Sequence, residues 1–358
     1  MEVFFMSYIL LFLISIIFSL ILNQIGMILP WLFGPILATI ILRKFTSLTY
    51  RWPKWLGDIG LYILGAQIGV SFTKEVFVDI AGDFLSVIFL SVMILLSAIM
   101  ISFVFKHIVN CTTETALLAS IPGALNQMIV MAEENKNANI LVVTLAQTSR
   151  LLFVIMIVPF ISSMTSDNHE HYQINRAKQV FEVLTLEQIV MIVAMIAAGI
   201  YILKLIHFPV PDMLGPTFAI LIWNLSTGLN FTVPMSLINF AQLLFGVRIG
   251  LQMYDLSSQI NKRLFIGIFI QNILLIICAI FLSIVINIYT DHNFNDVFLS
   301  AAPGGMAQII VVALETGANV AMISSYHIFR IFLILLIVAP IMSWYLTHRL
   351  NSDIGSAD

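Results

Sequence analysis

Long runs of apolar residues alternate with short polar segments along this chain. Such runs cover residues 3–22, 84–105, 189–205, 264–286 and 331–346. Each approaches or exceeds the roughly 20 residues that an α-helix needs to cross a bilayer. The pattern predicts an all-α polytopic membrane protein. The first run is expected to be a retained helix, because it lacks the basic start and the small-residue cleavage site of a signal peptide.

The composition agrees with this prediction. Of the 358 residues, 60% are hydrophobic and only 10% are charged, whereas a soluble domain carries about 25% charged residues. Cys111 and Cys278 follow no metal-binding or redox spacing and are expected to pack as small hydrophobic residues. The sequence His169-Glu170-His171 has no further ligand cluster to complete a metal site. We therefore expect no metal and no cofactor.

The chain contains an internal duplication with an offset of 181 residues. The segment 29–38, LPWLFGPILA, aligns with 210–219, VPDMLGPTFA, and GAQIG at 65–69 aligns with GVRIG at 246–250. Pro122–Glu134 matches Pro303–Glu315 at 7 of 13 positions, and after one dropped residue Arg150 matches Arg330. Matched glycines, prolines and a mid-span arginine do not follow from apolar composition alone, so the repeat is expected to be structural.

The duplication defines the domain organisation. We predict membrane repeat 1 at 1–163, a polar linker at 164–185, membrane repeat 2 at 186–348 and a short polar tail at 349–358. Each repeat is expected to hold about five transmembrane helices plus one Pro-Gly segment that is re-entrant or broken. If that segment crosses the membrane fully, each repeat has six spans and the repeats are parallel. If it returns to the side it came from, the repeats are inverted.

The distribution of Lys and Arg favours inversion. Cytoplasmic loops are enriched in these residues, and the inverted arrangement places ten inside and three outside, against eight and five in the parallel one. Both arrangements place the two termini in the cytoplasm. Inverted repeats with broken helices are typical of secondary transporters, whose sites lie near the membrane midplane.

The two Pro-Gly segments are the first candidates for a substrate-binding site. Irregular backbone at membrane depth is tolerated only where it is buried in protein or lines a cavity, and it leaves backbone groups free for a ligand. The alternative is a kink that lets helices pack closely. The candidate residues are Pro122, Gly123, Ala124, Asn126 and Gln127 in repeat 1, and Pro303, Gly304, Gly305 and Gln308 in repeat 2.

Arg150 and Arg330 complete the candidate substrate site. A charged residue at mid-span is costly and indicates function by default, here as a cation that faces an anionic group of the substrate. The alternative is a structural pair with a carboxylate or with carbonyls at a broken helix. Glu134 and Glu315 are the natural acidic partners, and together with His327 they are candidates for ion or proton coupling. The alternative for His327 is a hydrogen-bonded structural residue, which is the commoner role of a lone histidine in a helix bundle.

Two further charged positions are expected to be structural. Arg248 stands where repeat 1 has Gln67, and we expect its side chain to extend to the cytoplasmic interface. Asp58, near the start of its span, is expected to cap that helix. Nucleotide-binding, catalytic-triad and nucleic-acid-binding motifs are absent, so the protein is expected not to be an enzyme and not to bind nucleic acid.

The Pro-Gly segments PGALNQM and PGGMAQI, each followed by Ala-Asn and then by an arginine-bearing apolar span, resemble the AbrB duplication family of membrane proteins. This family also carries the labels transcriptional regulator and ammonia monooxygenase. Its usual pattern has Pro-Gly-Gly in both halves, Glu at Gln127 and Gln308, and Asp at Asn139 and Asn319. The departures weaken a transfer of ion coupling from relatives. The family is also distantly similar to inverted-repeat transporters.

The expected function is that of a secondary transporter for a small, anionic solute in the plasma membrane. The alternative is a membrane sensor that affects gene expression through a partner. The expected partners are the lipid bilayer, the solute and a second copy of the chain.

Overall fold

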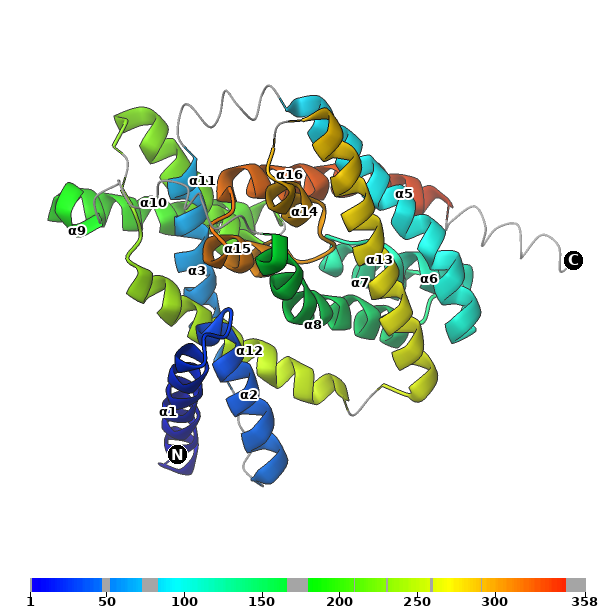
Figure 1. Ribbon diagram of the computed structural model, residues 1–358, viewed down its shortest axis with the longest axis horizontal. Helices are drawn as coiled ribbons and strands as arrows, with labels where there is room; N and C mark the ends of the chain where they lie inside the picture. Colours follow the sequence, from blue (N-terminus) through cyan, green and yellow to red (C-terminus); the bar gives the residue numbers. More distant parts are fainter. Residues whose placement is uncertain are drawn as a thin grey trace, which may run out of the picture. The chain divides into compact units, whose positions relative to one another are not determined.

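A computed structural model of the protein describes residues 2–46, 52–72, 83–165, 180–208, 210–229, 231–257, 260–290 and 292–345. Every regular element in these ranges is a helix (Figure 1). In chain order they are α1 (Glu2–Gln24), α2 (Pro30–Phe45), α3 (Lys54–Ser71), α5 (Phe84–Val109), α6 (Thr113–Ser120), α7 (Leu125–Glu134), α8 (Ile140–Thr165), α9 (Val180–Val183), α10 (Leu186–Leu205), α11 (Pro211–Thr227), α12 (Met235–Ser257), α13 (Lys262–Tyr289), α14 (Phe294–Ala301), α15 (Met306–Glu315), α16 (Val320–Leu333) and the π-helical turn η2 (Ile334–Val338).

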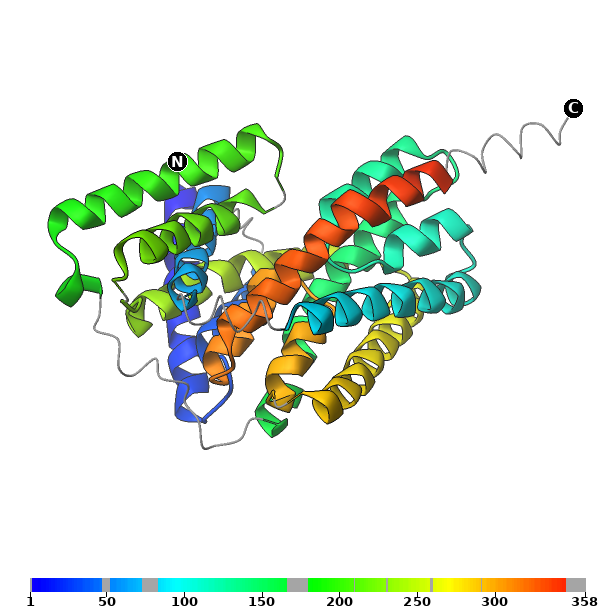
Figure 2. The ribbon, with the colours of Figure 1, turned by 90° about the horizontal axis from the view of Figure 1, so that it is seen from above.

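Five helical stretches within the described residues are long and apolar enough to cross a membrane. They are α5, α8, α10, α13 and the stretch Val320–Tyr345, which joins α16, η2 and the turns after them. Figure 2 shows this last stretch as one continuous rod, coloured orange to red. The predictions of a helical fold and of several helices able to cross a membrane are therefore confirmed for the described residues, while the number of about ten spans stays a prediction. Most of the polar linker and the whole tail lie outside the described residues.

The chain divides into two compact units that do not follow the repeat boundary. Unit 1 comprises residues 1–81, 158–259 and 309–322, and unit 2 comprises residues 82–157, 260–308 and 323–358. Unit 1 thus contains α1 to α3 from repeat 1 and α10 to α12 from repeat 2. Unit 2 contains α5 to α7 from repeat 1 and α13 and α14 from repeat 2. Each unit is built from both copies of the duplicated sequence.

Close helix packing through glycines organises unit 1. A Cβ on Gly65 of α3 would collide with the carbonyl oxygen of Met213 in α11, and one on Gly69 would lie 2.7 Å from the carbonyl oxygen of Thr217. The absence of side chains at these glycines lets the two backbones approach, as small residues do in membrane helix pairs. The hydroxyl of Thr217 adds a hydrogen bond to the carbonyl oxygen of Gly65 at 2.9 Å.

The second repeat makes the same contacts in exchanged roles. A Cβ on Gly246 of α12 would lie 2.6 Å from the carbonyl oxygen of Leu32 in α2, and one on Gly250 would lie 3.0 Å from that of Ile36. These are the positions that match Gly65, Met213, Gly69 and Thr217 at the offset of 181 residues. Within each repeat, Gly34 meets Ser19 of α1 and Gly215 meets Ile200 of α10, again at matched positions. The duplicated glycines therefore perform the same packing task twice.

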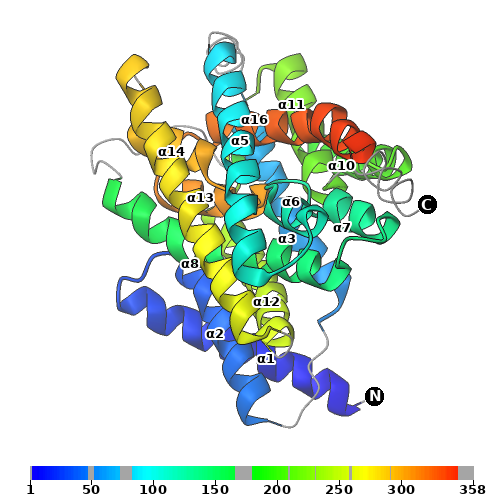
Figure 3. The same ribbon diagram turned by 90° about the vertical axis from the view of Figure 1, so that its right-hand side faces the viewer.

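Unit 2 is arranged around α5 and α13, which run side by side (Figures 1 and 3). Gly267 of α13 contacts α5, because a Cβ there would collide with Val109. The short helices α6 and α7 join at a break between Ser120 and Leu125, and α14 and α15 join at a matched break between Ala301 and Met306. An apolar cluster that includes Met128, Val143 and Ile334 packs around the first break.

We predict that Gly199→Leu destabilises the protein by about 1–3 kcal/mol, as overpacking of a filled interior does. A Cβ at Gly199 of α10 would lie 2.9 Å from the carbonyl oxygen of Gly215, and backbone cannot yield as a flexible side chain does. Ala198 is exposed on the same helix, so Ala198→Leu is the matched control and should change stability by less than about 0.5 kcal/mol. Thermal unfolding of both purified variants in detergent measures the difference. Equal melting temperatures would contradict the close packing.

Candidate functional site

The two helix breaks in unit 2 leave carbonyl groups without helical partners. The last four carbonyls of any α-helix lack an intrahelical donor, and away from water each must be satisfied by other groups. Here α6 ends at Ser120 and α14 ends at Ala301, and both helices consist of buried residues near these ends. The side chains that satisfy these carbonyls define the candidate site.

Neutral amide side chains donate hydrogen bonds to some of the carbonyl groups at the α6 end. The Nε2 group of Gln147 in α8 donates to the carbonyl oxygens of Leu118 at 2.7 Å and Ile121 at 3.0 Å. The Nε2 group of Gln271 in α13 donates to the carbonyl oxygen of Ala119 at 3.2 Å. Uncharged donors are therefore sufficient for several of these carbonyls.

A guanidinium group also donates hydrogen bonds to carbonyl groups at the α6 end. Nη1 of Arg150 donates to the carbonyl oxygens of Ser120 and Ile121, both at 3.3 Å. Nη2 of Arg150 donates to Oε1 of Gln147, which lies one turn earlier in α8. The spacing of three residues within α8 places Gln147 and Arg150 on one helix face, so that both reach the same helix end.

The matched residues of repeat 2 form the same kind of hydrogen bonds with the carbonyl groups at the α14 end. Nη1 of Arg330 donates to the carbonyl oxygen of Ala302 at 3.0 Å, and Nη2 donates to that of Ser300 at 2.5 Å. His327, which matches Gln147, bonds through Nε2 to the carbonyl oxygen of Leu299 at 3.0 Å. A carbonyl oxygen only accepts, so Nε2 of His327 carries a proton. This hydrogen bond gives His327 a structural role.

Both guanidinium groups are buried without a carboxylate partner among the described residues. Arg150 and Arg330 are each 1% exposed, and the ion pairs of the described chain join other residues. The Nε groups of both arginines are buried and have no hydrogen-bond partner in that part of the chain. The observed partners are therefore carbonyls at broken helices, the alternative that the sequence left open for both arginines.

The Pro-Gly residues form the breaks between the short helices. Gly123 has φ +107°, a conformation that residues with a Cβ rarely adopt. In the first segment Pro122 and Ala124 are buried and Gln127 is half-buried, whereas Asn126 is exposed. In the second segment Pro303, Gly304 and Gln308 are buried, and Gly305 is half-buried.

Glu134 forms no ion pair with Arg150 or Arg330 among the described residues of unit 2. Glu134 is exposed at the end of α7. Glu315 belongs to unit 1, where its carboxylate accepts a hydrogen bond from the backbone N–H of Leu29. Leu29 has the left-handed φ of +56° and precedes Pro30, the first residue of α2. Glu315 therefore stabilises a helix start.

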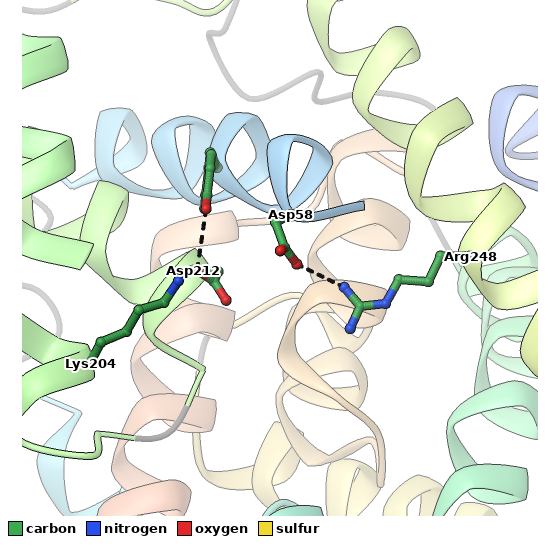
Figure 4. A network of polar contacts seen from close by, with 5 residues as sticks. Asp58, Lys204, Asp212 and Arg248 are labelled. Carbon is green, nitrogen blue, oxygen red and sulfur yellow. Dashed lines mark hydrogen bonds and ion pairs between the residues drawn. The ribbon is translucent and has the colours of Figure 1, made fainter. Parts of the chain in front are cut away.

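The expected capping role of Asp58 was wrong, whereas the interfacial position expected for Arg248 stays a prediction. Nη1 of Arg248 lies 3.1 Å from Oδ1 of Asp58, and α3 begins after Pro53 without a side-chain cap (Figure 4). The stem of Arg248 crosses α3 at Gly57, where a Cβ would lie 2.8 Å from its Cδ. Because the partner belongs to the other repeat, inspection of each helix alone could not reveal the pair. Lys204 and Asp212, joined at 2.7 Å, form a second ion pair near it in unit 1.

No local sequence pattern marked Gln147 and Gln271 as donors to the α6 end, or Asn139 as a helix cap. The Oδ1 atom of Asn139 accepts from the backbone N–H of Val142 at 3.1 Å and so caps α8. Asn319 caps α16 in the same way through Met322 at 3.0 Å. Asn and Asp are both strong N-cap residues, so a cap accounts for an Asp at these positions without a bound cation.

A metal centre has no support in the part of the chain that the structure describes. No group of three or more His, Cys, Asp and Glu side chains there lies close enough to hold a metal ion. The His169-Glu170-His171 stretch lies outside the described residues.

The described residues define a helical protein with several helices long and apolar enough to cross a membrane and with a buried polar site. The model of the family described as "Transition state regulatory protein AbrB" matches residues 31–346, and the chain belongs to this family. The chain is 26% identical over 326 residues to "Putative regulator AbrB" of Escherichia coli K12, covering 89% of this chain and 91% of that protein. It is 23% identical over 313 residues to "Uncharacterized protein YhjN" of Bacillus subtilis 168, covering 84% of this chain and 80% of that protein.

We predict that Asn139→Ala lowers the stability of the protein by about 0.5–2 kcal/mol, because α8 loses its N-cap. Asn139→Asp should keep the parent stability, since a carboxylate also caps the helix and favours its positive end. Lys136→Ala is the control, because Lys136 is exposed nearby. Thermal unfolding in detergent measures all three variants. A loss for Asn139→Asp as large as the loss for Asn139→Ala would contradict the capping role.

Proposed function

We propose that the protein is a secondary transporter for a small anionic solute and that Arg150 and Arg330 bind this solute. The observation that carries the proposal is the burial of two guanidinium groups that have no carboxylate partner among the described residues. An isolated charge in an apolar interior is costly. A bound anion would remove this cost and would accept hydrogen bonds from the buried Nε groups.

A purely structural role explains less of the arrangement. The negative ends of α6 and α14 attract cations, but each carries only about half a charge. Gln147 and Gln271 satisfy the carbonyls of Leu118 and Ala119 without any charge. If hydrogen bonding to carbonyls were the whole requirement, amides would suffice at positions 150 and 330 as well.

The proposed architecture is two inverted repeats with re-entrant Pro-Gly segments. The distribution of Lys and Arg supports inversion, and the exchanged glycine contacts support a two-fold relation between the repeats. Each compact unit combines helices of both repeats, which suits a transporter that moves one bundle against the other. We place the protein in the plasma membrane with both termini in the cytoplasm.

The proposed partners are the lipid bilayer, the solute and a second copy of the chain. We propose no enzyme activity, no cofactor and no contact with nucleic acid. Glu134, Glu315 and His327 remain candidates for ion or proton coupling, although Glu315 and His327 already have structural hydrogen bonds.

A membrane sensor that acts on gene expression through a partner is the second candidate function. The name of the relative from Escherichia coli, a regulator, favours it. The same anion site would serve a sensor. Flux through proteoliposomes separates the two functions: saturable uptake of an anion supports transport, and binding without flux supports sensing.

We predict that Arg150→Lys and Arg330→Lys each insert and fold normally but lose at least about tenfold in anion affinity or flux. An ammonium group cannot reproduce the planar fork with which guanidinium binds an oxyanion. The measurements are anion uptake in proteoliposomes and thermal stabilisation of the purified protein by a panel of small anions. Arg263→Lys is the control, because Arg263 is exposed at the start of α13. Full activity of both Lys variants would reject the anion site and leave the structural role.

We predict that residues 107–113 and 290–296 lie on opposite sides of the membrane. Cys111 is a native probe for the first segment, and Asn293→Cys supplies one for the second in a Cys111→Ser background, since Asn293 is exposed. Burial raises the pKa of the Cys111 thiol, so labelling with a membrane-impermeant maleimide needs pH of about 8.5 or longer times. Cytoplasmic access to Cys111 and external access to the introduced Cys are expected. Labelling of both from one side would contradict the inverted arrangement.

A further inference from the structure

The two arginines of unit 2 meet at one place in the first break. Nη1 of Arg150 donates to the carbonyl oxygen of Ile121 at 3.3 Å. The Cδ atom of Arg330 lies 3.8 Å from the position that a Cβ on Gly123 would occupy. Since Ile121 and Gly123 are two residues apart, both guanidinium side chains border the same short stretch of backbone. They therefore form one site, although 180 positions separate them in the sequence.

The charge of this site is not balanced by its surroundings. The carboxyl ends of α6 and α14 each contribute about −0.5 charge, and the amino ends of α7 and α15 that follow the breaks each contribute about +0.5. These four contributions cancel, so the two guanidinium groups leave about two positive charges. The carboxylates on the same helices, Glu114 and Asp296, lie in the first turns of α6 and α14, at the ends remote from the breaks.

The site also holds hydrogen-bond donors that the described part of the protein does not use. Each guanidinium has five N–H groups. Arg330 uses two of them on carbonyl oxygens, and its Nε group has no partner there. The hydroxyl group of Ser120, at the end of α6, is buried and has no partner among the described residues either. Unused donors around a doubly positive centre fit a ligand that is rich in acceptor oxygens.

We propose that this site binds one divalent oxyanion, which contacts both Arg150 and Arg330, in preference to a monovalent anion of the same shape. The inference rests on the proposed function and adds the charge of the solute to it. Two guanidinium groups favour an anion with two negative charges because each group then has its own charge-assisted hydrogen bonds. A monovalent anion would leave one buried cation uncompensated.

Matched anions test the charge preference on the full-length protein in detergent. Sulfate and methanesulfonate share a tetrahedral sulfonyl group and differ by one charge. Succinate and its monomethyl ester differ by one charge on the same carbon chain. Isothermal titration calorimetry at constant ionic strength should give one site per chain and, for at least one pair, a divalent member that binds about 10- to 100-fold more tightly.

Substitution of one arginine should abolish this preference. Arg150→Gln and Arg330→Gln keep an amide that can donate to the carbonyls, as Gln147 does, and remove one charge. Each variant should lose more affinity for the divalent anion than for its monovalent partner, so that the preference of about 10- to 100-fold disappears. Arg263→Gln, outside the site, should retain the parent preference. Gel filtration and thermal unfolding identify any variant that fails to fold, and the anion pairs on the unsubstituted protein still decide the question.

The outcomes separate this inference from the proposed function. If the monovalent member of each pair binds as tightly as the divalent member, the divalent preference is wrong while an anion site remains. If the folded protein binds none of the four anions, the anion site itself is wrong, and the divalent preference fails with it. A preference that survives in both Gln variants would also overturn the inference, because the charge would then be recognised elsewhere.

Discussion

The end of a helix that stops inside an apolar interior imposes the constraint on which unit 2 depends. Its last carbonyl groups can reach neither water nor a next helical turn, and each unsatisfied group is costly. In unit 2 these carbonyls are served by side chains from neighbouring long helices. Gln147 and Arg150 in α8, Gln271 in α13, and His327 and Arg330 in α16 all direct donors at the ends of α6 or α14. The breaks explain why polar residues occur deep in otherwise apolar helices.

In unit 1 the helices pack through close backbone contacts at glycines, whereas in unit 2 polar side chains bind the helix ends. The helices of unit 1 contain glycines where two backbones approach, and side chains are removed at these contacts. Its ion pairs, such as Arg248 with Asp58 and Lys204 with Asp212, involve partly exposed side chains. Exposed ion pairs stabilise little. These ion pairs therefore contribute little to the helix packing in this unit, whereas the fully buried Arg150 and Arg330 belong to unit 2.

Residues at matched positions of the two repeats often form the same kind of contact even where their types differ. Gln147 and His327 are chemically different, yet both donate to a carbonyl near the end of a short helix. Asn139 and Asn319 each cap the long helix that follows the Pro-Gly segment. Conversely, Arg248 and Gln67 stand at matched positions and do different things, because Arg248 has Asp58 of the other repeat as a partner. The matched backbone determines which groups need a hydrogen-bond partner, and the neighbouring residues determine which side chain provides it.

The sequence by itself determined the helical membrane class, the duplication and the positions of the two helix breaks. These follow from local properties: the length of apolar runs, the recurrence of Pro and Gly, and the inability of a Pro-Gly pair to continue a helix. It also indicated Arg150 and Arg330, since a charge at mid-span is unusual wherever it lies. Only the tertiary structure decided their partners. Glu134 and Glu315 are close to the breaks in sequence but have other surroundings, while the carbonyls of Ser120 and Ser300 lie 30 residues from the arginines that bind them. Hydrogen bonds and close backbone contacts depend on how helices from distant parts of the chain cross, and no periodicity along one helix contains that information.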